Sequence, residues 1–350
     1  MVIAACVSQS PSTTTAPPST TSLATTTSST QPGTTSSIPA TTTTGAPLEL
    51  VLPVATDQMP VPWEEILFIP YGNTPETLGT SLGGDGEGIQ IGPEYGAQSP
   101  DGTWWFLDGA KYRLAQFSAE GEFLMEVVLE EDLLTDGVYF QYQLPRVLDD
   151  GMLVANRLAG DQTIMLRWRG EELDTVVVDA NFVPRIDNGT TLYGFAIGEE
   201  PVPMQVNVYD GTSTEAEWFQ TRAGDRFRIT VMPGHLQVLL PDAGAAISLP
   251  VTAGQVGGNA FFSTEVASGI DGGLYIFMVG SAENDESLQL AGYLEIYPDG
   301  SMSEMQPMRD PFTSADPGSP AHLGVRPQTN DPWLMFIDED GVRVYGPAAP

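Results

Sequence analysis

Turn residues divide the stretch from Pro93 to Leu129 into four short extended segments. The pairs Asp101-Gly102, Asp108-Gly109 and Glu120-Gly121 separate these segments. Asp-Gly and similar pairs supply the positive φ that tight hairpin turns require, so the stretch predicts a four-stranded antiparallel meander. A single meander leaves an apolar face open, and it needs further copies to stack against.

The pattern of a turn followed by an apolar strand recurs along the chain. Turn pairs of this kind stand at Asp101-Gly102, Asp150-Gly151, Asn188-Gly189, Pro233-Gly234, Asp271-Gly272 and Asn330-Asp331. Late turns follow an aromatic-containing strand at Gly121, Gly170, Gly211 and Gly300, whereas the fourth repeat has no clear late turn between Val238 and Val251. The mean spacing lies in the range of propeller blades, roughly 40–50 residues. We therefore predict an all-β, six-bladed β-propeller, with five or seven blades as alternatives.

Closure of the ring gives an independent argument for this fold. The last repeat offers only three strands, at 322–326, 333–337 and 342–345. The early segment Trp63–Pro70 would supply the fourth strand, and sharing one blade between the two ends of the domain removes exposed strand edges. We therefore place the propeller at residues 63–350.

The N-terminus resembles a bacterial lipoprotein signal. Ile3-Ala4-Ala5-Cys6 is similar to the lipobox, in which small residues precede a cysteine that is cleaved at its amino side and acylated. The stretch from Met1 to Ala5 is shorter than the apolar region of a signal peptide, roughly 7–15 residues. An earlier start of translation and an ordinary thiol at Cys6 are the two alternatives. We assign residues 1–6 to a residual signal peptide with its lipobox.

A low-complexity segment follows this cysteine. Residues 8–45 are almost entirely Thr, Ser, Pro and Ala, a composition that buries too little apolar surface to fold. We interpret residues 7–62 as a disordered tether that ends in a Pro- and Val-rich segment leading into the fold. This layout is similar to that of lipid-anchored cell-surface proteins of Gram-positive bacteria. The resemblance implies an extracytoplasmic, membrane-anchored location, and secretion is the alternative.

The charge of the chain excludes one class of partner. The sequence has 13 Lys and Arg against 46 Asp and Glu, and its formal net charge is −33. Such an acidic chain is repelled by nucleic-acid phosphates and by anionic membrane surfaces, so we expect no nucleic acid and a membrane contact only through the N-terminal lipid. Scattered acids serve solubility but create no coordination geometry, so we expect no cofactor, with calcium the one open possibility. We also expect a monomer.

The first repeat resembles the NHL-type blade of six-bladed propellers. In that blade a Pro-Asp-Gly turn precedes an apolar strand, an Arg-containing strand and an aromatic residue before a glycine turn. The matching residues here are Pro100-Asp101-Gly102, Trp104–Asp108, Arg113, Phe117 and Gly121. The fifth repeat shows the pattern more faintly. Relatives of that broad group include scaffolds, calcium-dependent lactonases, sugar-chain lyases and solute-binding proteins, so the resemblance implies a fold and leaves the function open.

Arginines recur where the innermost strand of a blade is expected to line the central channel. They are Arg146, Arg185, Arg228 (with Arg226 beside it) and Arg326. Guanidinium groups bind carboxylate, sulfate or phosphate through paired hydrogen bonds, so a ring of them predicts an anion-binding channel mouth. The alternative is that each arginine pairs with a neighbouring Asp or Glu and only closes the channel.

Candidates for metal binding and acid–base chemistry have no diagnostic spacing. The oxygen ligands available to calcium on different blades are Glu94, Asn156, Asn207, Asn259 and Glu265. Asparagine is also an ordinary turn residue, so we assign no metal ligand. His235 and His322 show neither a metal nor a triad spacing, and we assign no catalytic residue.

The sequence therefore favours a binding or recognition module over an enzyme. We expect an extracytoplasmic, lipid-anchored propeller that binds a protein, a glycan or a small anion through one face and its channel mouth. The alternative is a calcium-dependent hydrolase or lyase that acts on a sugar lactone or a polysaccharide.

Overall fold

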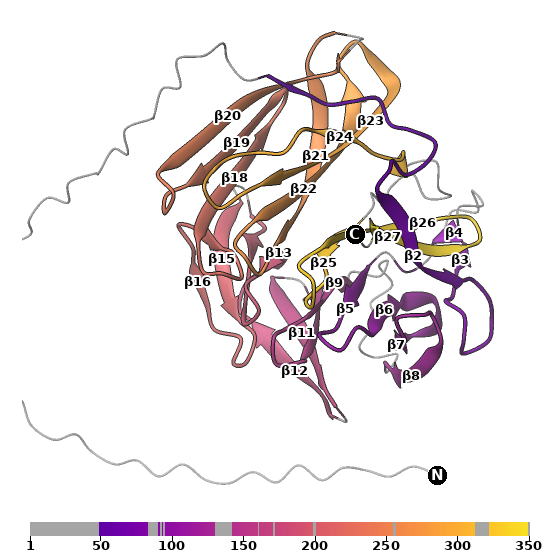
Figure 1. Ribbon diagram of the computed structural model, residues 1–350. Helices are drawn as coiled ribbons and strands as arrows, with labels where there is room; N and C mark the ends of the chain where they lie inside the picture. The colour runs from indigo at the N-terminus through magenta and orange to yellow at the C-terminus, as the bar shows by residue number, and fades with distance from the viewer. Residues whose placement is uncertain are drawn as a thin grey trace, which may run out of the picture. The chain divides into compact units, whose positions relative to one another are not determined.

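A computed structural model of the protein describes residues 49–82, 90–91, 93, 95–129, 142–159, 161–170, 172–198, 201–254, 257–311 and 322–348. The lipidation candidate Cys6, the tether before residue 49 and the calcium candidate Glu94 lie outside the described residues. The described strands form seven sheets, of which the six with four or five strands lie around a common axis (Figure 1). This arrangement is the predicted six-bladed β-propeller.

The first three blades follow one another along the chain, and each has four antiparallel strands. Blade 1 contains β5 (Gly96–Gln98), β6 (Trp104–Asp108), β7 (Arg113–Phe117) and β8 (Phe123–Val128). Blade 2 contains β9 (Tyr142–Val147), β10 (Leu153–Ala159), β11 (Gln162–Arg169) and β12 (Glu172–Val178). Blade 3 contains β13 (Phe182–Asp187), β14 (Thr191–Ala196), β15 (Val202–Asn207) and β16 (Ser213–Glu215).

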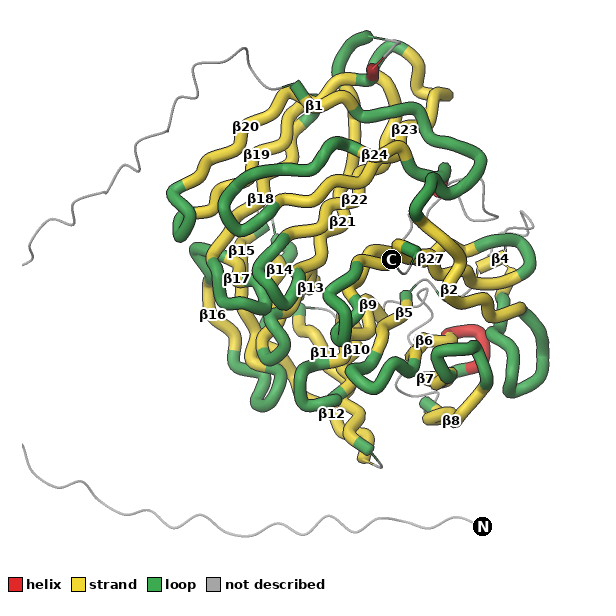
Figure 2. The backbone as a smooth tube through the Cα atoms, in the orientation of Figure 1, coloured by secondary structure: helices red, strands yellow, loops and turns green. Residues whose placement is uncertain are grey.

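Of the other three blades, blades 4 and 6 each include a strand from the start of the domain. Blade 4 contains β17 (Phe219–Gln220), β18 (Arg226–Met232), β19 (His235–Leu240), β20 (Ala245–Thr252) and a fifth strand, β1 (Leu50–Val51). Blade 5 contains β21 (Ala260–Ser268), β22 (Leu274–Ala282), β23 (Asp285–Ile296) and β24 (Gln306–Pro307). Blade 6 contains β25 (His322–Val325), β26 (Pro332–Ile337), β27 (Gly341–Pro347) and β2 (Trp63–Pro70). A separate two-stranded ribbon pairs β3 (Ser81–Leu82) with β4 (Gln90–Ile91), and turns link the strands (Figure 2).

The ring closes as the sequence predicts, because β2 pairs antiparallel with β27. In this register Leu67 lies opposite Val344 and Ile69 lies opposite Val342. All four of these side chains are buried, so closure joins the two ends of the domain through backbone pairing and through core packing.

The core consists of side chains that fill the spaces between neighbouring blades. Trp104 of blade 1 meets Trp333 of blade 6 edge to face, with ring centroids 5.1 Å apart. Phe219 of blade 4 reaches Tyr193 of blade 3, with a centroid separation of 5.9 Å. Such contacts fix the spacing of the blades, and therefore also the positions of the strands around the channel.

The predicted turns hold in blade 1 with one exception. Gly102 and Gly121 have φ values of +90° and +86°, as tight turns require. At Asp108-Gly109 the chain forms a short 3₁₀ turn, η1 (Gly109–Lys111), and the left-handed residue is Tyr112 at φ +54°. The buried Asp108 carboxylate accepts hydrogen bonds from Arg113 Nε at 3.0 Å and from the Gly79 N–H at 3.1 Å. Asp108 therefore anchors the preceding loop, and the hairpin between β6 and β7 is closed by η1 instead of a two-residue Asp-Gly turn.

The sequence prediction misplaces the start of blade 4 by one strand: it takes the second strand of the blade for the first. Pro233-Gly234 connects β18 to β19, so it is not the opening turn of the blade. The opening turn contains Gly224, at φ +91°, and the late turn that the sequence did not reveal contains Gly244, at φ +64°. The error arises because β17 has only two residues and carries no extended apolar pattern.

Residues 49–62, which the sequence groups with the tether and the segment that follows it, pack along blades 4 and 5. We call this segment the strap (dark at the upper right of Figure 1). Its first strand, β1, pairs parallel with β20, with Leu50 opposite Val251. Leu52 is fully buried in the core cluster of blades 4 and 5. Further along, the Ala55 N–H donates to the Gln289 carbonyl at 3.0 Å.

We predict that the strap contributes substantially to stability. Leu52→Ala leaves a cavity in a packed region and should lower the free energy of unfolding by about 2–5 kcal/mol. The adjacent Val51 is 49% exposed, so Val51→Ala should change it by less than about 0.5 kcal/mol. Urea denaturation of both variants measures the difference. Equal effects of the two substitutions would show that the strap does not pack as described.

Candidate functional site: the central channel

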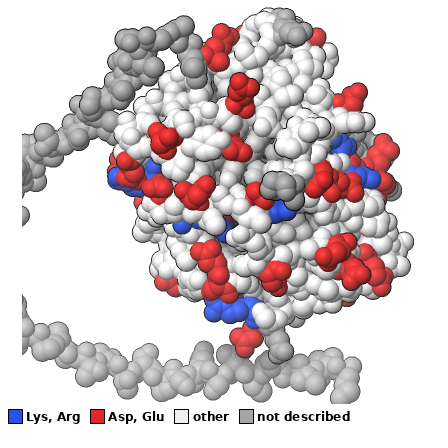
Figure 3. All heavy atoms as spheres, in the orientation of Figure 1, with Lys and Arg blue, Asp and Glu red and all other residues white. Residues whose placement is uncertain are grey.

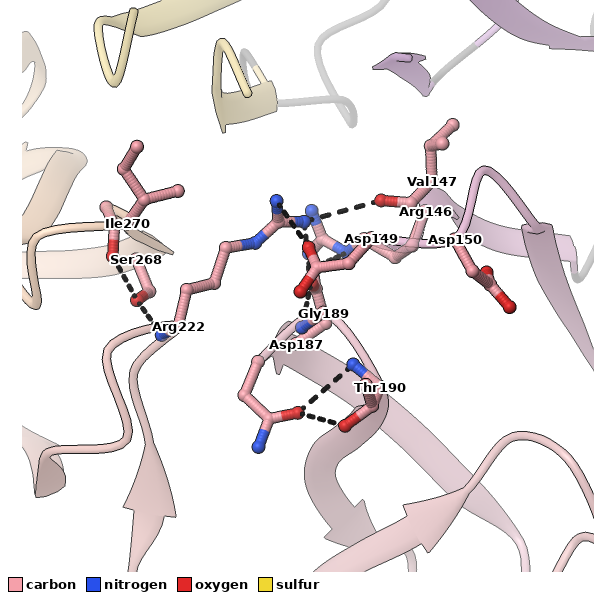
Figure 4. Close-up of polar contacts among 12 residues, drawn as sticks. Arg146, Val147, Asp149, Asp150, Asp187, Gly189, Thr190, Arg222, Ser268 and Ile270 are labelled. Atoms are coloured by element: carbon pink, nitrogen blue, oxygen red, sulfur yellow. Dashed lines mark hydrogen bonds and ion pairs between the residues drawn. The ribbon is translucent and has the colours of Figure 1, made fainter. Parts of the chain in front are cut away.

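In five blades the last residues of the first strand converge near the axis, and in blade 4 Arg222, which follows the first strand, reaches the same point. A small cavity of about 40 Å³ lies at this point and receives residues from all six blades. Its polar side chains include Arg146, Asp187, Arg222 and Ser268. We call this region the upper level of the channel (Figure 4).

An ion-pair network closes the upper level. Arg222 Nη2 donates to Asp187 Oδ1 at 2.8 Å and to the Val147 carbonyl at 3.3 Å, and Arg222 Nη1 lies 3.5 Å from Asp149 Oδ1. The Arg222 N–H donates to Ser268 Oγ at 2.9 Å. Figure 4 shows the Arg222 side chain extending across the gap between these elements. Burial disfavours the charge, but Asp187 and Asp149 outweigh it and raise the pKa of Arg222.

Arg146 lies between this network and a second group of polar residues. Its side chain is buried, and its Nη2 donates to the Arg185 carbonyl at 3.1 Å. Its Nε lies 4.0 Å from Asp187 Oδ2, beyond hydrogen-bond distance, and has no hydrogen-bond partner among the described residues. The Arg146 Nε–H is therefore a hydrogen-bond donor in the channel that has no acceptor among the described residues.

We call Arg185, Glu265 and His322, together with the Arg146 side chain, the lower level of the channel. Arg185 sits at a bulge in β13, where Pro184 pairs with Gly194 and Ile186 pairs with Tyr193. The bulge leaves Arg185 without a cross-strand partner and exposed to solvent. Within the described residues its guanidinium makes no ion pair.

Glu265 and His322 form the other half of the lower level. His322 Nδ1 lies 3.8 Å from Glu265 Oε2, which is longer than a hydrogen bond. The imidazole is only 1% exposed, and neither ring nitrogen has a hydrogen-bond partner in the described part of the chain. The rings of Tyr95 and Trp333 stand edge-on to the imidazole, at 5.5 and 5.3 Å. A buried imidazole whose two nitrogens are both unpartnered is unusual.

The lower level combines a neutral imidazole with an ionised carboxylate. Burial lowers the pKa of His322, and Arg146 adds to this effect, whereas Glu265 opposes it. Burial alone would raise the pKa of Glu265, but His322, Arg185 and Arg146 outweigh it and lower that pKa. At neutral pH the site therefore offers two cations, one anion and an uncharged imidazole.

The structure brings together two of the four arginines that the sequence singles out. Arg146 and Arg185 border the channel. Arg228 lies on β18, the second strand of its blade, and its guanidinium stacks over the Trp218 ring at 4.9 Å. Arg326 follows β25, but its Nη2 lies against Gly346 on β27. Arg228 lies away from the channel because the sequence prediction took the second strand of blade 4 for the first. Arg326 lies away from it because its side chain extends across blade 6 toward β27.

Of the residues considered for calcium, the four that the structure describes lie in different settings. Asn207 accepts a hydrogen bond from the Tyr209 N–H at 2.8 Å in a turn, and Asn259 lies beside Gly234 in another turn. Asn156 is buried on β10, and Glu265 is in the channel. The described residues contain no group of three or more His, Cys, Asp or Glu side chains arranged around a metal position.

Three channel residues escaped the sequence interpretation. Arg222 was missed because it follows the very short β17, where no strand was expected. Asp187 ends β13 directly before the Asn188-Gly189 turn, and a position next to an opening turn is the signal that could have marked it. His322 was considered and set aside because sequence spacing cannot show that it meets Glu265 from the neighbouring blade.

The fold and the channel define this protein as a six-bladed β-propeller with a polar, arginine-containing axis. A family model described as "Domain of unknown function (DUF7485)" matches residues 61–346. The chain therefore belongs to this family. No curated protein matches the chain.

Several solved structures are similar in fold. Regucalcin, a calcium-binding protein from Agrobacterium tumefaciens, is 11% identical over 86% of this chain and 98% of its own, with a TM-score of 0.42. A gluconolactonase from Xanthomonas campestris is 9% identical over 81% and 97%, with a TM-score of 0.40. A catalytically inactive virginiamycin B lyase from Staphylococcus aureus is 10% identical over 76% and 98%, with a TM-score of 0.41. These similarities are too distant to transfer an activity.

We predict that the upper-level ion pair is worth much more than a surface pair. The side chains of Arg222 and Asp187 are 14% and 10% exposed, so Arg222→Ala leaves a carboxylate poorly solvated and should cost about 3 kcal/mol of stability. Arg226 and Asp242 form a matched pair that is 47% and 37% exposed, and Arg226→Ala should cost less than about 1 kcal/mol. Denaturant unfolding of the two variants compares them. Equal costs would contradict the buried network.

The lowered pKa of His322 predicts a pH dependence. The imidazole resists protonation in the folded protein, but it takes up a proton near its ordinary value of 6.5 when unfolded. Stability should therefore fall as pH drops below about 6.5. Differential scanning calorimetry at pH 7.5 and 5.5 should show a smaller loss for His322→Gln than for the wild type. His235→Gln, at a histidine that contacts Ser248 outside the channel, should retain the wild-type loss. An unchanged loss in His322→Gln would contradict a buried neutral imidazole.

Proposed function

We propose that the protein is a binding module that holds a small anion in the lower level of its central channel. The ligand's charged group would accept hydrogen bonds from Arg185 and from the Nε of Arg146. Arginine suits this task because its planar fork binds carboxylate, sulfate or phosphate oxygens in pairs.

The unpaired state of Arg185 carries the proposal. In a chain with 46 acidic and only 13 basic residues, a carboxylate partner should be easy to find. Eight arginines of the described chain have one within 4.0 Å: Arg113, Arg146, Arg167, Arg169, Arg222, Arg226, Arg309 and Arg343. Arg185, Arg228 and Arg326 have no such pair among the described residues, and of these three only Arg185 borders the channel that also contains Glu265. A cation kept free in such an acidic protein supports a site for an external anion.

The acidic surface supports the same choice of site. Asp and Glu side chains are spread over the visible face of the protein (Figure 3). They repel anions from most of the surface, so an anion gains favourable contacts where arginines gather. Binding at the axis also fits the general rule that ligand sites lie where several elements converge.

The calcium-dependent hydrolase or lyase is the competing proposal. Among the oxygen ligands considered for it, Glu265 faces the channel beside two guanidinium groups. Two nearby positive charges disfavour a divalent cation at this point. Calcium therefore serves as a comparison in the binding experiment.

The cellular location stays a prediction from the sequence. Lipidation at Cys6 and anchoring to the outer face of a bacterial membrane depend on residues outside the described part of the chain. Within the described residues, no helix is long and apolar enough to cross a membrane. We keep the lipid-anchored, extracytoplasmic location as part of the proposal.

We predict that small anions stabilise the protein through Arg185. Acetate, glycolate, phosphate and sulfate would be titrated at constant ionic strength while the melting temperature is followed. A ligand present at 100 times its Kd adds about 2.7 kcal/mol of stability, enough to raise the Tm by several degrees. Arg185→Ala should abolish this increase, and its exposed side chain makes the substitution compatible with folding.

Arg228→Ala is the matched control, because Arg228 also lacks an ion pair among the described residues but lies outside the channel. This variant should keep the full response to anions. If no anion raises the Tm, or if Arg185→Ala responds like the wild type, the proposed function is wrong. Stabilisation by calcium alone would favour the enzyme alternative.

A further inference from the structure

The charge of the lower level restricts the charge of its ligand. Arg146 and Arg185 contribute two positive charges, Glu265 contributes one negative charge, and His322 is neutral. Asp187 and Asp149 are counted in the upper level, where Arg222 lies 2.8 Å from Asp187 and 3.5 Å from Asp149, and the Asp149 side chain is 60% exposed, so solvent screens its charge. The lower level therefore has an excess of one positive charge. A monoanion compensates this excess, whereas a dianion brings a surplus charge close to Glu265 and a zwitterion leaves the excess uncompensated.

The Glu265–His322 pair restricts the ligand further. Its separation of 3.8 Å is too long for a direct hydrogen bond. A hydroxyl oxygen placed about 2.7–2.9 Å from both atoms fits within this span. It would donate its proton to Glu265 Oε2 and accept the Nδ1–H of a neutral His322. One hydroxyl group would thus hydrogen-bond to both Glu265 Oε2 and His322 Nδ1, which are too far apart to hydrogen-bond to each other.

The residues around this position favour a ligand whose hydroxyl group is attached to a small carbon skeleton. The rings of Tyr95 and Trp333 stand edge-on to His322 and hold its imidazole plane in place. The upper level above it is narrow, with a cavity of about 40 Å³, and the Arg222 network spans it. Arg146 lines this cavity, whereas Arg185, Glu265 and His322 do not, so an opening this small beside the lower level favours a ligand of a few heavy atoms over a polymer segment.

Resting on the anion site proposed above, we propose that the lower level binds a small hydroxycarboxylate. The carboxylate would lie on the guanidinium of Arg185 and on the Nε of Arg146. The hydroxyl would bridge Glu265 and His322. This arrangement would give partners to Arg185, to the Arg146 Nε and to the His322 Nδ1, while the His322 Nε2 keeps none among the described residues, and it matches the single positive charge of the lower level.

Isothermal titration calorimetry of the full chain with four small probes tests this proposal. Glycolate carries a carboxylate and a hydroxyl, acetate only a carboxylate, glycine a carboxylate and an ammonium, and sulfate two negative charges. At pH 7.5 and constant ionic strength, glycolate should bind at least about tenfold more tightly than acetate, because acetate leaves Glu265 and His322 without the hydroxyl partner. Glycine and sulfate should bind more weakly than glycolate.

Two substitutions separate the roles of the lower-level residues. His322→Leu removes the hydroxyl contact and should reduce glycolate affinity to that of acetate, while acetate affinity changes less than about twofold. Glu265→Gln keeps the size of the side chain and raises the excess charge to two. It should therefore reverse the preference of glycolate over sulfate, and it provides a second test if His322→Leu does not fold. Arg228→Ala should bind all four probes like the wild type.

The outcomes distinguish this inference from the function on which it rests. If acetate and glycolate bind equally to the wild type, the hydroxycarboxylate inference is overturned and the anion site stands. Tightest binding of glycine or sulfate overturns the inference in the same way. If no probe binds, both proposals fail. Glycolate selectivity that survives both His322→Leu and Glu265→Gln would show that the hydroxyl is recognised elsewhere.

Discussion

The pairing of β2 with β27 is the constraint on which the rest of the structure depends. Each blade of the propeller has apolar side chains on both faces, so a chain of blades is stable only when the first and last blades also meet. Because β2 comes from the start of the domain, blade 6 cannot form without it. The buried residues Leu67 and Ile69 then join the core between blades 6 and 1. Closure therefore couples residues that are almost 280 positions apart in the sequence.

Closure also creates the chemistry of the channel. Arg146, Arg185, Glu265 and His322 come from four different blades, and a completed ring holds their strands at fixed distances. In the resulting channel, burial lowers the pKa of His322, while His322, Arg185 and Arg146 together lower the pKa of Glu265. In the upper level, Arg222 forms ion pairs with Asp187 and Asp149. In the lower level, the Arg146 Nε and both ring nitrogens of His322 have no hydrogen-bond partner among the described residues. This contrast separates a structural ion-pair cluster from a candidate binding site.

Much of the fold could be predicted from the sequence because turn chemistry is local. An Asp-Gly pair indicates a tight turn with positive φ from two residues alone. The strand Trp63–Pro70 has no neighbouring strand in the sequence to pair with, which predicts that it pairs with the last repeat. The site was less accessible, because it depends on which blades face each other. Blade 4 shows the difficulty: β17 has two residues and no pattern, so Arg228 was placed at the channel and Arg222 was missed. His322 was visible, but its contact with Glu265 depends on tertiary structure alone.

Hydrogen–deuterium exchange of β2 tests ring closure most directly, because exchange reports whether a strand opens separately from its neighbours. Peptides that cover Trp63–Pro70 and Gly341–Pro347 would be followed by mass spectrometry under native conditions. If β2 completes blade 6, its amides exchange as slowly as those of β27, and both lose protection together when denaturant unfolds the domain. Rapid exchange of Trp63–Pro70 while Gly341–Pro347 stays protected would contradict the closed ring, and with it the channel that the ring defines.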